Sequence, residues 1–144
     1  MPTKARIGMG TLLSYSNGLI PEIFTLLAER VTISGPGFSR DSLDATHMDS
    51  PNNWREFIAG LKDGGEVTIE SNYVPTDATQ NANTGALALF NSGATRNWKL
   101  VLPVSPIVTW ILPAFVTNFE PDIPLDDKMM LSLTLKVAGE PTLE

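Results

Sequence analysis

The sequence predicts a mainly β protein with two short helices, and three observations support this prediction. Hydrophobic and polar residues alternate with a period of two in several segments, as they do in half-buried strands. Eleven prolines and eleven glycines among 144 residues favour many turns over long helices. Hydrophobic residues make up 42% and charged residues 18% of the chain, which is typical of a folded protein. We therefore expect residues 1–144 to form a single domain with its own core.

The clearest strand signal lies near the carboxyl end. Between Met129 and Val137, every second residue is large and apolar, and the residues between them are mostly polar. Helical spacing would not produce this alternation, so a strand with one buried face is predicted. The same alternation, in shorter form, predicts strands at 66–73, 98–102 and 114–119. Weaker strand candidates are 7–14, 24–34 and 38–47.

One segment in the middle of the chain follows helical spacing instead. Ser50 and Pro51 form a typical start, with a capping side chain before a proline at the first helical position. Gly64 and Gly65 would end the helix. Four large apolar residues between these points are spaced at i, i+3, i+4 and i+7, and we expect them to pack the helix onto the sheet. They are Trp54, Phe57, Ile58 and Leu61.

A second helix is expected within residues 78–91, where small and apolar residues gather and Gly93 would end it. Residues 34–37 and 63–65 have the composition of turns. Residues 120–127 contain two prolines and four acidic residues, and we interpret them as an exposed loop.

The sequence offers little for catalysis. The chain has no cysteine and a single histidine, so disulfides, thiolate chemistry and histidine-rich metal sites are excluded. Asp44, His47 and Asp49 lie close together, but ordinary polar residues before a helix cap are the favoured interpretation over a metal or acid–base site. Residues 60–65 lack the lysine and hydroxyl pattern of a phosphate loop. We expect no enzymatic activity, no cofactor and no metal.

The net charge and the hydropathy of the chain limit the classes of partner that it is expected to bind. The formal net charge is −6, and the ten lysines and arginines are scattered, so tight nucleic-acid binding is not expected. The amino terminus lacks the continuous apolar block of a signal peptide. The most apolar stretch, residues 103–116, is interrupted by three prolines and is too short to span a bilayer. No membrane association is expected.

Several blocks of sequence resemble the tail tube proteins of long-tailed phages of the lambda type. The most specific are Trp-Arg-Glu-Phe at 54–57 and Gly-Leu-Lys-Asp-Gly-Gly at 60–65, which together are more telling than either alone. The resemblance covers nearly the whole chain and keeps the order of its elements; it includes residues 33–41, 44–51, 54–66, 114–120, 124–128 and 133–142. The lambda protein has an additional immunoglobulin-like domain at its carboxyl end, and here we expect the tube body alone.

The resemblance implies a β-sandwich or partial barrel with a flanking helix. It also implies a structural virion protein, made in the host bacterial cytoplasm, whose subunits form hexameric rings stacked into a hollow tail tube. The implied partners are other copies of the chain and the tail terminator, tail tip and tape measure proteins, while DNA passes through the channel without specific binding. Exposed sheet edges agree with this picture, because ring closure would pair them.

The resemblance also indicates which residues join one ring to the next. The region 34–50 is expected to be a long hairpin that projects from the subunit. The expected inter-ring contacts are Phe38, Arg40, Asp41, Asp44, His47 and Asp49. A mobile loop that orders only on assembly is compatible with this interpretation.

One alternative function remains open from the sequence. A monomeric β-sandwich could bind a carbohydrate or a cell-surface ligand through exposed tryptophans. The candidates are Trp54, Trp98 and Trp110, although packing in a core or an interface is the commoner role of this residue.

Overall fold

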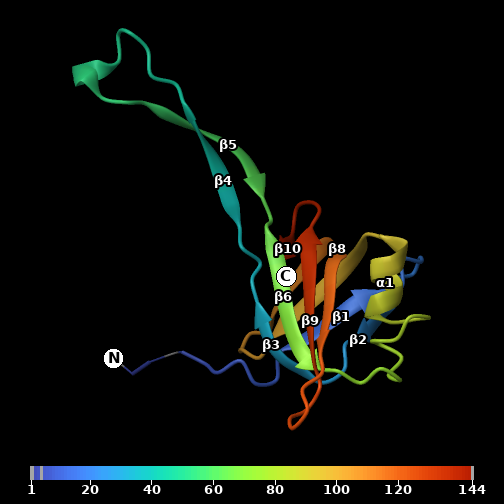
Figure 1. Ribbon diagram of the computed structural model, residues 1–144. Helices are drawn as coiled ribbons and strands as arrows, with labels where there is room; N and C mark the ends of the chain where they lie inside the picture. Colours follow the sequence, from blue (N-terminus) through green and yellow to red (C-terminus); the bar gives the residue numbers. More distant parts are fainter. Residues whose placement is uncertain (1, 4, 144) are drawn as a thin grey trace.

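A computed structural model of the chain describes residues 2–3 and 5–143 (Figure 1). In these residues, an antiparallel sheet with the strand order β2-β1-β7-β8-β9-β6-β3 forms the body, and a tenth strand, β10, pairs with β8. The strands of the body are β1 (Leu12–Ser16), β2 (Phe24–Leu26), β3 (Arg30–Ser34), β6 (Glu66–Asn72), β7 (Arg96–Leu102), β8 (Val108–Asp122), β9 (Met130–Val137) and β10 (Thr142–Leu143). The predicted mainly β class is confirmed.

The sheet curls so that its two ends share one core. Leu13 on β1 and Ile69 on β6 belong to the same buried cluster, although three strands separate β1 from β6 in the sheet. The side chain of Arg30, at the start of β3, donates from Nε to the carbonyl oxygen of Thr11, 3.2 Å away and just before β1. These contacts bring both edges of the sheet together, in agreement with a partial barrel.

The core follows the alternation seen in the sequence. Leu131, Leu133, Leu135 and Val137 on β9 are buried and face Val67 and Ile69 of the neighbouring β6. Trp98 on β7 is 1% exposed and packs against Tyr15 of β1, with ring centroids 5.4 Å apart. The expected strands at 98–102 and 114–119 lie within β7 and β8, and the expected strand 66–73 matches β6 except for its last residue. On β8 the alternation breaks after Val116, where a bulge shifts the pairing with β9.

All three weaker strand predictions had wrong boundaries, and the candidate 38–47 contains only β4 (Ser39–Asp44). Residues 7–10 are not in a strand, and β1 begins only at Leu12. The segment 24–34 is divided into β2 and β3, because Glu29 has a φ of 49° between them, a conformation that no strand continues through.

The predicted second helix exists but is short. Helix α1 (Ala86–Ser92) lies against β8 and buries Ala86 in the core (Figure 1). Gly93 ends it with a φ of 66°, as expected. Residues 78–85 form turns instead, and buried Gln80 holds them by donating to Asn72 O (2.9 Å) and accepting from Val74 N (2.8 Å).

A long two-stranded hairpin projects from one end of the body (Figure 1). It consists of β4 (Ser39–Asp44) and β5 (Phe57–Asp63), joined at the tip by a single 3₁₀ turn, η1 (Pro51–Asn53). The helix predicted from Trp54 to Leu61 is therefore wrong. A helical turn does begin at Pro51, as expected. It ends after three residues, because Asn52 and Asn53 have φ values of 53° and 62°, which a right-handed helix does not continue through.

Candidate assembly surface

The hairpin is a regular antiparallel pair interrupted by one irregularity. Asp44 pairs with Phe57 and Leu43 with Ile58 near the tip, and Arg40 pairs with Lys62 near the body. The register shifts between Arg40 and Ser42. The hairpin has neighbours in the described chain only at its root, so most of its two faces are open.

Large apolar side chains cover these open faces. The exposed fraction of Trp54 is 74% and that of Leu61 is 83%. These values contradict the prediction that the two residues hold a helix against the sheet, because no sheet lies beneath them. Phe38 is exposed at the root of the hairpin, and the other exposed large apolar residues, nearer the tip, are Leu43, Met48, Phe57 and Ile58.

Polar contacts order the tip. The carboxylate of Asp44 accepts from the backbone N–H of Thr46 (2.9 Å) and lies 3.4 Å from Arg55 Nη1. The pKa of Asp44 is lowered, mainly by hydrogen bonds from Thr46 and to a smaller extent by one from Arg55. On the other side of the tip, Glu56 Oε2 accepts from Ser50 Oγ (2.7 Å) and lies 3.2 Å from His47 Nδ1. The tip is thus a structured loop held by its own side chains.

The root of the hairpin is joined to the body through Asp63. Its carboxylate accepts from the backbone N–H of Gly65 (2.9 Å) and lies 3.1 Å from Lys136 Nζ on β9. The pKa of Asp63 is lowered, mainly by the hydrogen bond from the Gly65 N–H and to a smaller extent by Lys136. Gly65 itself has a φ of 69°, and a Cβ there would overlap the carbonyl oxygen of Gly37, in the segment between β3 and β4. This close crossing directs the hairpin away from the body.

The six predicted contact residues are all exposed, but they lie at different levels of the hairpin. Phe38 and Arg40 lie at the root, and Asp41 and Asp44 lie on β4. His47 and Asp49 lie in the tip loop. Their contact with a neighbouring ring remains a prediction.

Sequence reasoning missed the apolar half of this surface. The four residues assigned to helix packing lie on the projecting hairpin or its tip, where they are available to a partner. The sequence did contain a signal for a hairpin. Gly60 interrupts the apolar stripe, and residues 57–63 and the strand candidate 38–47 lie on either side of a turn at Pro51. That arrangement is typical of a hairpin.

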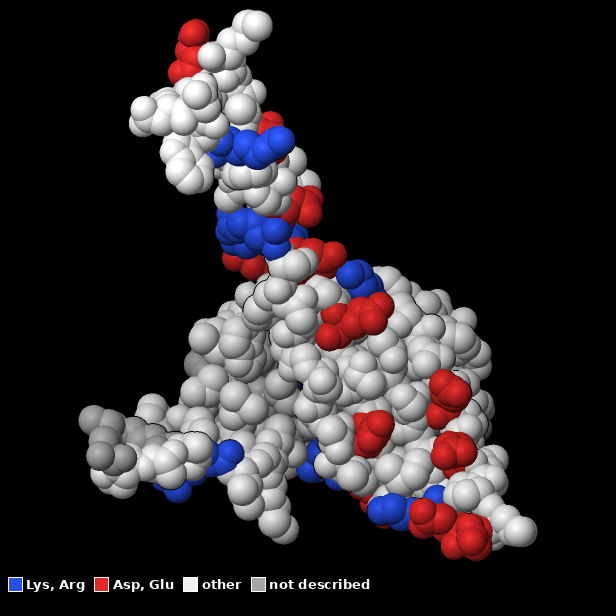
Figure 2. All heavy atoms as spheres, turned by 60° about the vertical axis from the view of Figure 1, so that its left-hand side comes forward, with Lys and Arg blue, Asp and Glu red and all other residues white. Residues whose placement is uncertain are grey.

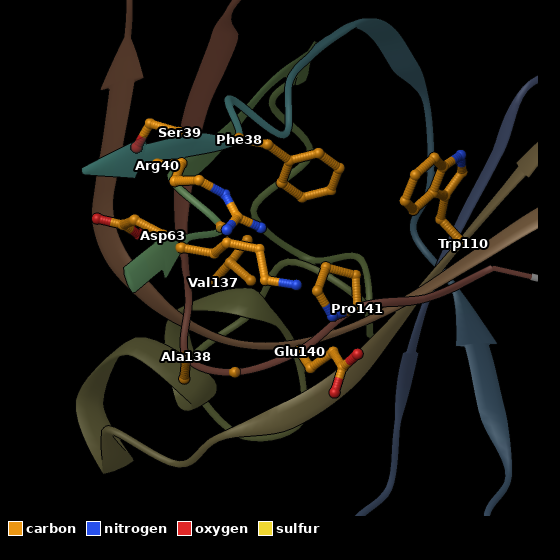
Figure 3. Close-up of a pocket in the computed structure, with 12 residues that line it drawn as sticks. Phe38, Ser39, Arg40, Asp63, Trp110, Val137, Ala138, Glu140 and Pro141 are labelled. Atoms are coloured by element: carbon orange, nitrogen blue, oxygen red, sulfur yellow. The ribbon is translucent and has the colours of Figure 1, made fainter. Parts of the chain in front are cut away.

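A cleft lies between the hairpin root and the body (Figure 3). Its volume is about 840 Å³. Phe38 and Trp110 form one side, with ring centroids 5.5 Å apart, and Arg40 points into the space between Phe38 and Pro141. Lys62 and Glu140 also line it.

Charged side chains of both signs lie on the hairpin and on the body. Figure 2 shows blue basic and red acidic residues together along the hairpin, and mostly red acidic residues over this face of the body, with blue ones at its far end. Within residues 2–3 and 5–143, no group of three histidine, cysteine or acidic side chains could hold a metal, and Asp44, His47 and Asp49 form no such group. No helix in the described part of the chain is long and apolar enough to cross a membrane.

The family of the chain follows from its sequence over nearly all of its length. Residues 6–144 match the family model of the lambda phage tail tube protein. The chain belongs to this family. It is a structural subunit of a phage tail tube, and family membership favours this function over a monomeric binding module.

Solved structures of tail tubes share the fold. The tail of an empty gene transfer agent particle, refined with sixfold symmetry, superimposes with a TM-score of 0.73 at 21% identity, over 97% of this chain and 99% of that one. The chain from the virion of a native gene transfer agent gives 0.72 at 19% identity, with the same coverage. The SPP1 tail tube gives 0.68 at 14% identity, over 95% of this chain and 77% of that one. A comparison with curated proteins gives no match.

Proposed function

We propose that this tail tube subunit forms hexameric rings, that the rings stack into a hollow tube, and that the β4–β5 hairpin makes the contact between successive rings. DNA passes through the channel into the host without specific binding. The tail terminator, tail tip and tape measure proteins are its further partners. Residues 1–144 act as one tail tube domain, and the chain is made in the host cytoplasm before it enters the virion tail.

The observation that carries this proposal is the apolar surface of the hairpin. Six large apolar side chains are exposed on the hairpin, four on its two strands and two in its tip loop, and the body does not support the hairpin along most of its length. An isolated hairpin is at best marginally stable in water, and contiguous exposed apolar patches mark interaction sites. The hairpin therefore needs a partner, and in a stack of rings that partner is the next ring.

Three further observations support the same function. The short edge strands β2 and β3 leave backbone groups available for pairing with a neighbour, as a ring requires. The net charge of −6 and the scattered cations suit a channel that DNA must leave freely. The sixfold symmetry of the gene transfer agent tail supports a ring of six. We propose that the role is structural and that the chain has no enzymatic activity, because its family is one of tube proteins.

The test is assembly with and without the apolar hairpin surface. We expect the purified chain, when concentrated, to form rings and tubes with a central channel in negative-stain micrographs. The triple variant W54S/F57S/L61S should remain folded, by circular dichroism, and should lose the tubes. The matched control Leu19→Ser also removes an exposed apolar side chain, in the β1–β2 turn, and should keep them. Tubes of normal length from the triple variant would contradict the proposal.

A further inference from the structure

Two cations at the hairpin root lack a partner in the subunit. Arg40 on β4 lies directly opposite Lys62 on β5, and like charges opposite each other in a sheet are destabilising. Among residues 2–3 and 5–143, neither has a carboxylate within 4.0 Å of its charged nitrogens. Asp63, the acid next to Lys62 on β5, is bonded to Lys136. The pair therefore has an uncompensated repulsion that an anionic partner would relieve.

These cations lie beside an apolar wall. Both line the cleft described above, together with the ring pair of Phe38 and Trp110 and the ring of Pro141 (Figure 3). Glu140 is the one carboxylate in the cleft lining besides Asp63. The cleft thus combines a cationic side with an aromatic side, and it fits a segment that is both acidic and apolar.

The chain itself contains such a segment at the opposite end of the body. The loop between β8 and β9, residues 123–129, exposes Ile123 (65%) and Leu125 (103%). Exposed acids flank these side chains at Asp122, Asp126 and Asp127, and Lys128 is the single cation of the loop. The loop therefore has the complementary character, apolar and acidic.

The cleft and the loop lie at opposite ends of one strand. The cleft includes Val137 and the residues that follow β9, whereas the loop comes directly before Met130, where β9 begins. Eight strand residues separate them, or about 25 Å along the strand direction. Two complementary surfaces at opposite ends of a subunit produce a head-to-tail contact that repeats without limit.

We propose that the cleft at the hairpin root binds the β8–β9 loop of a second copy of this chain, in the next ring of the tube. Asp126 and Asp127 of the loop lie against Arg40 and Lys62, and Ile123 and Leu125 lie against Phe38, Trp110 and Pro141. This contact fixes the axial spacing and the direction of stacking, while the tip of the hairpin reaches further along the next ring. The inference rests on the proposed stacking of rings and names the surface that receives the loop.

Charge exchange tests the pairing in the full-length chain. R40E/K62E and D126K/D127K each place like charges across the contact, so we expect the fraction of protein in tubes to fall by about tenfold or more in each. The quadruple variant restores opposite charges in exchanged positions and keeps the net charge of −6. It should form tubes again. E70K/E120K changes two exposed acids, on β6 and β8, by the same charge as the loop variant; both lie opposite Ser132 of β9, and the variant should assemble normally.

Each outcome decides one of the two proposals. Normal tubes from D126K/D127K would overturn the cleft–loop contact and leave ring stacking intact, because the unaltered chain still forms tubes. Failure of the quadruple variant to recover, with a native circular dichroism spectrum, would also overturn it. If R40E/K62E does not fold, the loop variant alone decides, since its changes lie on an exposed loop. If the unaltered chain forms no tubes, the proposed function itself is wrong.

Discussion

Two tryptophans of this chain show how differently its two regions are built. Trp98 lies in the body, 1% exposed, against Tyr15 and the other residues of the core. Trp54 lies near the tip of the hairpin, 74% exposed, and touches no core. In the body, burial of apolar side chains stabilises the isolated subunit. On the hairpin, apolar side chains are exposed to water in the single subunit, and we propose that another subunit covers them. In this proposal the same type of residue serves folding in one region and assembly in the other.

The largest expected effect is the loss of stability when a buried side chain of the body is removed. Trp98→Ala should lower the free energy of unfolding by about 3–5 kcal/mol, because it leaves a cavity among packed side chains. Denaturant unfolding followed by circular dichroism measures the change. A loss below about 1 kcal/mol would contradict the assignment of Trp98 to the core.

The next effect concerns the junction between body and hairpin. Gly65→Ala should cost about 2 kcal/mol or more, because alanine disfavours a φ of 69° and its Cβ would overlap Gly37 O. Gly37→Ala is the matched control: a Cβ there meets nothing within 4 Å, and its stability should change little. Equal stability of the two variants in denaturant titrations would show that the crossing is looser than described.

The sequence predicted the body far better than the hairpin, and the reason is physical. On β9 and β6, a core selects apolar residues at every second position, so the pattern reports burial directly. No core of the subunit selects Trp54, Phe57, Ile58 and Leu61, and their spacing of i, i+3, i+4 and i+7 suggested a helical stripe. In our proposal they are apolar because the next ring covers them, and a single sequence does not contain that partner. The six residues predicted as inter-ring contacts are exposed, but their level on the hairpin depends on where the tip turns.

A smaller effect is expected for the hairpin tryptophan. Trp54→Ala should change the free energy of unfolding of the unassembled subunit by less than about 0.5 kcal/mol, because the side chain makes few contacts there. The measurement uses dilute protein, below the concentration at which rings form. A loss comparable with that of Trp98→Ala would mean that the hairpin folds back onto the body in solution.

The smallest effect is the dependence of the hairpin root on pH. The pKa of Asp63 is lowered from its ordinary value of 3.8, so its contribution to stability is complete above the unfolded-state value and is lost as the pH falls through the folded-state value. A carboxyl titration by NMR should therefore place its midpoint below 3.8. Lys136→Ala should raise the midpoint only part of the way towards 3.8, because the hydrogen bond from the Gly65 N–H still lowers the pKa of Asp63. A midpoint at or above 3.8 in the unaltered chain would contradict the root geometry.

Electron cryomicroscopy of concentrated, unaltered protein tests most directly whether the hairpin exists to join subunits. We expect tubes built of stacked rings around a central channel, with each β4–β5 hairpin crossing from its own ring onto the next and its apolar side chains covered. Particles that remain single subunits at high concentration, or tubes whose hairpins point into solvent, would contradict it.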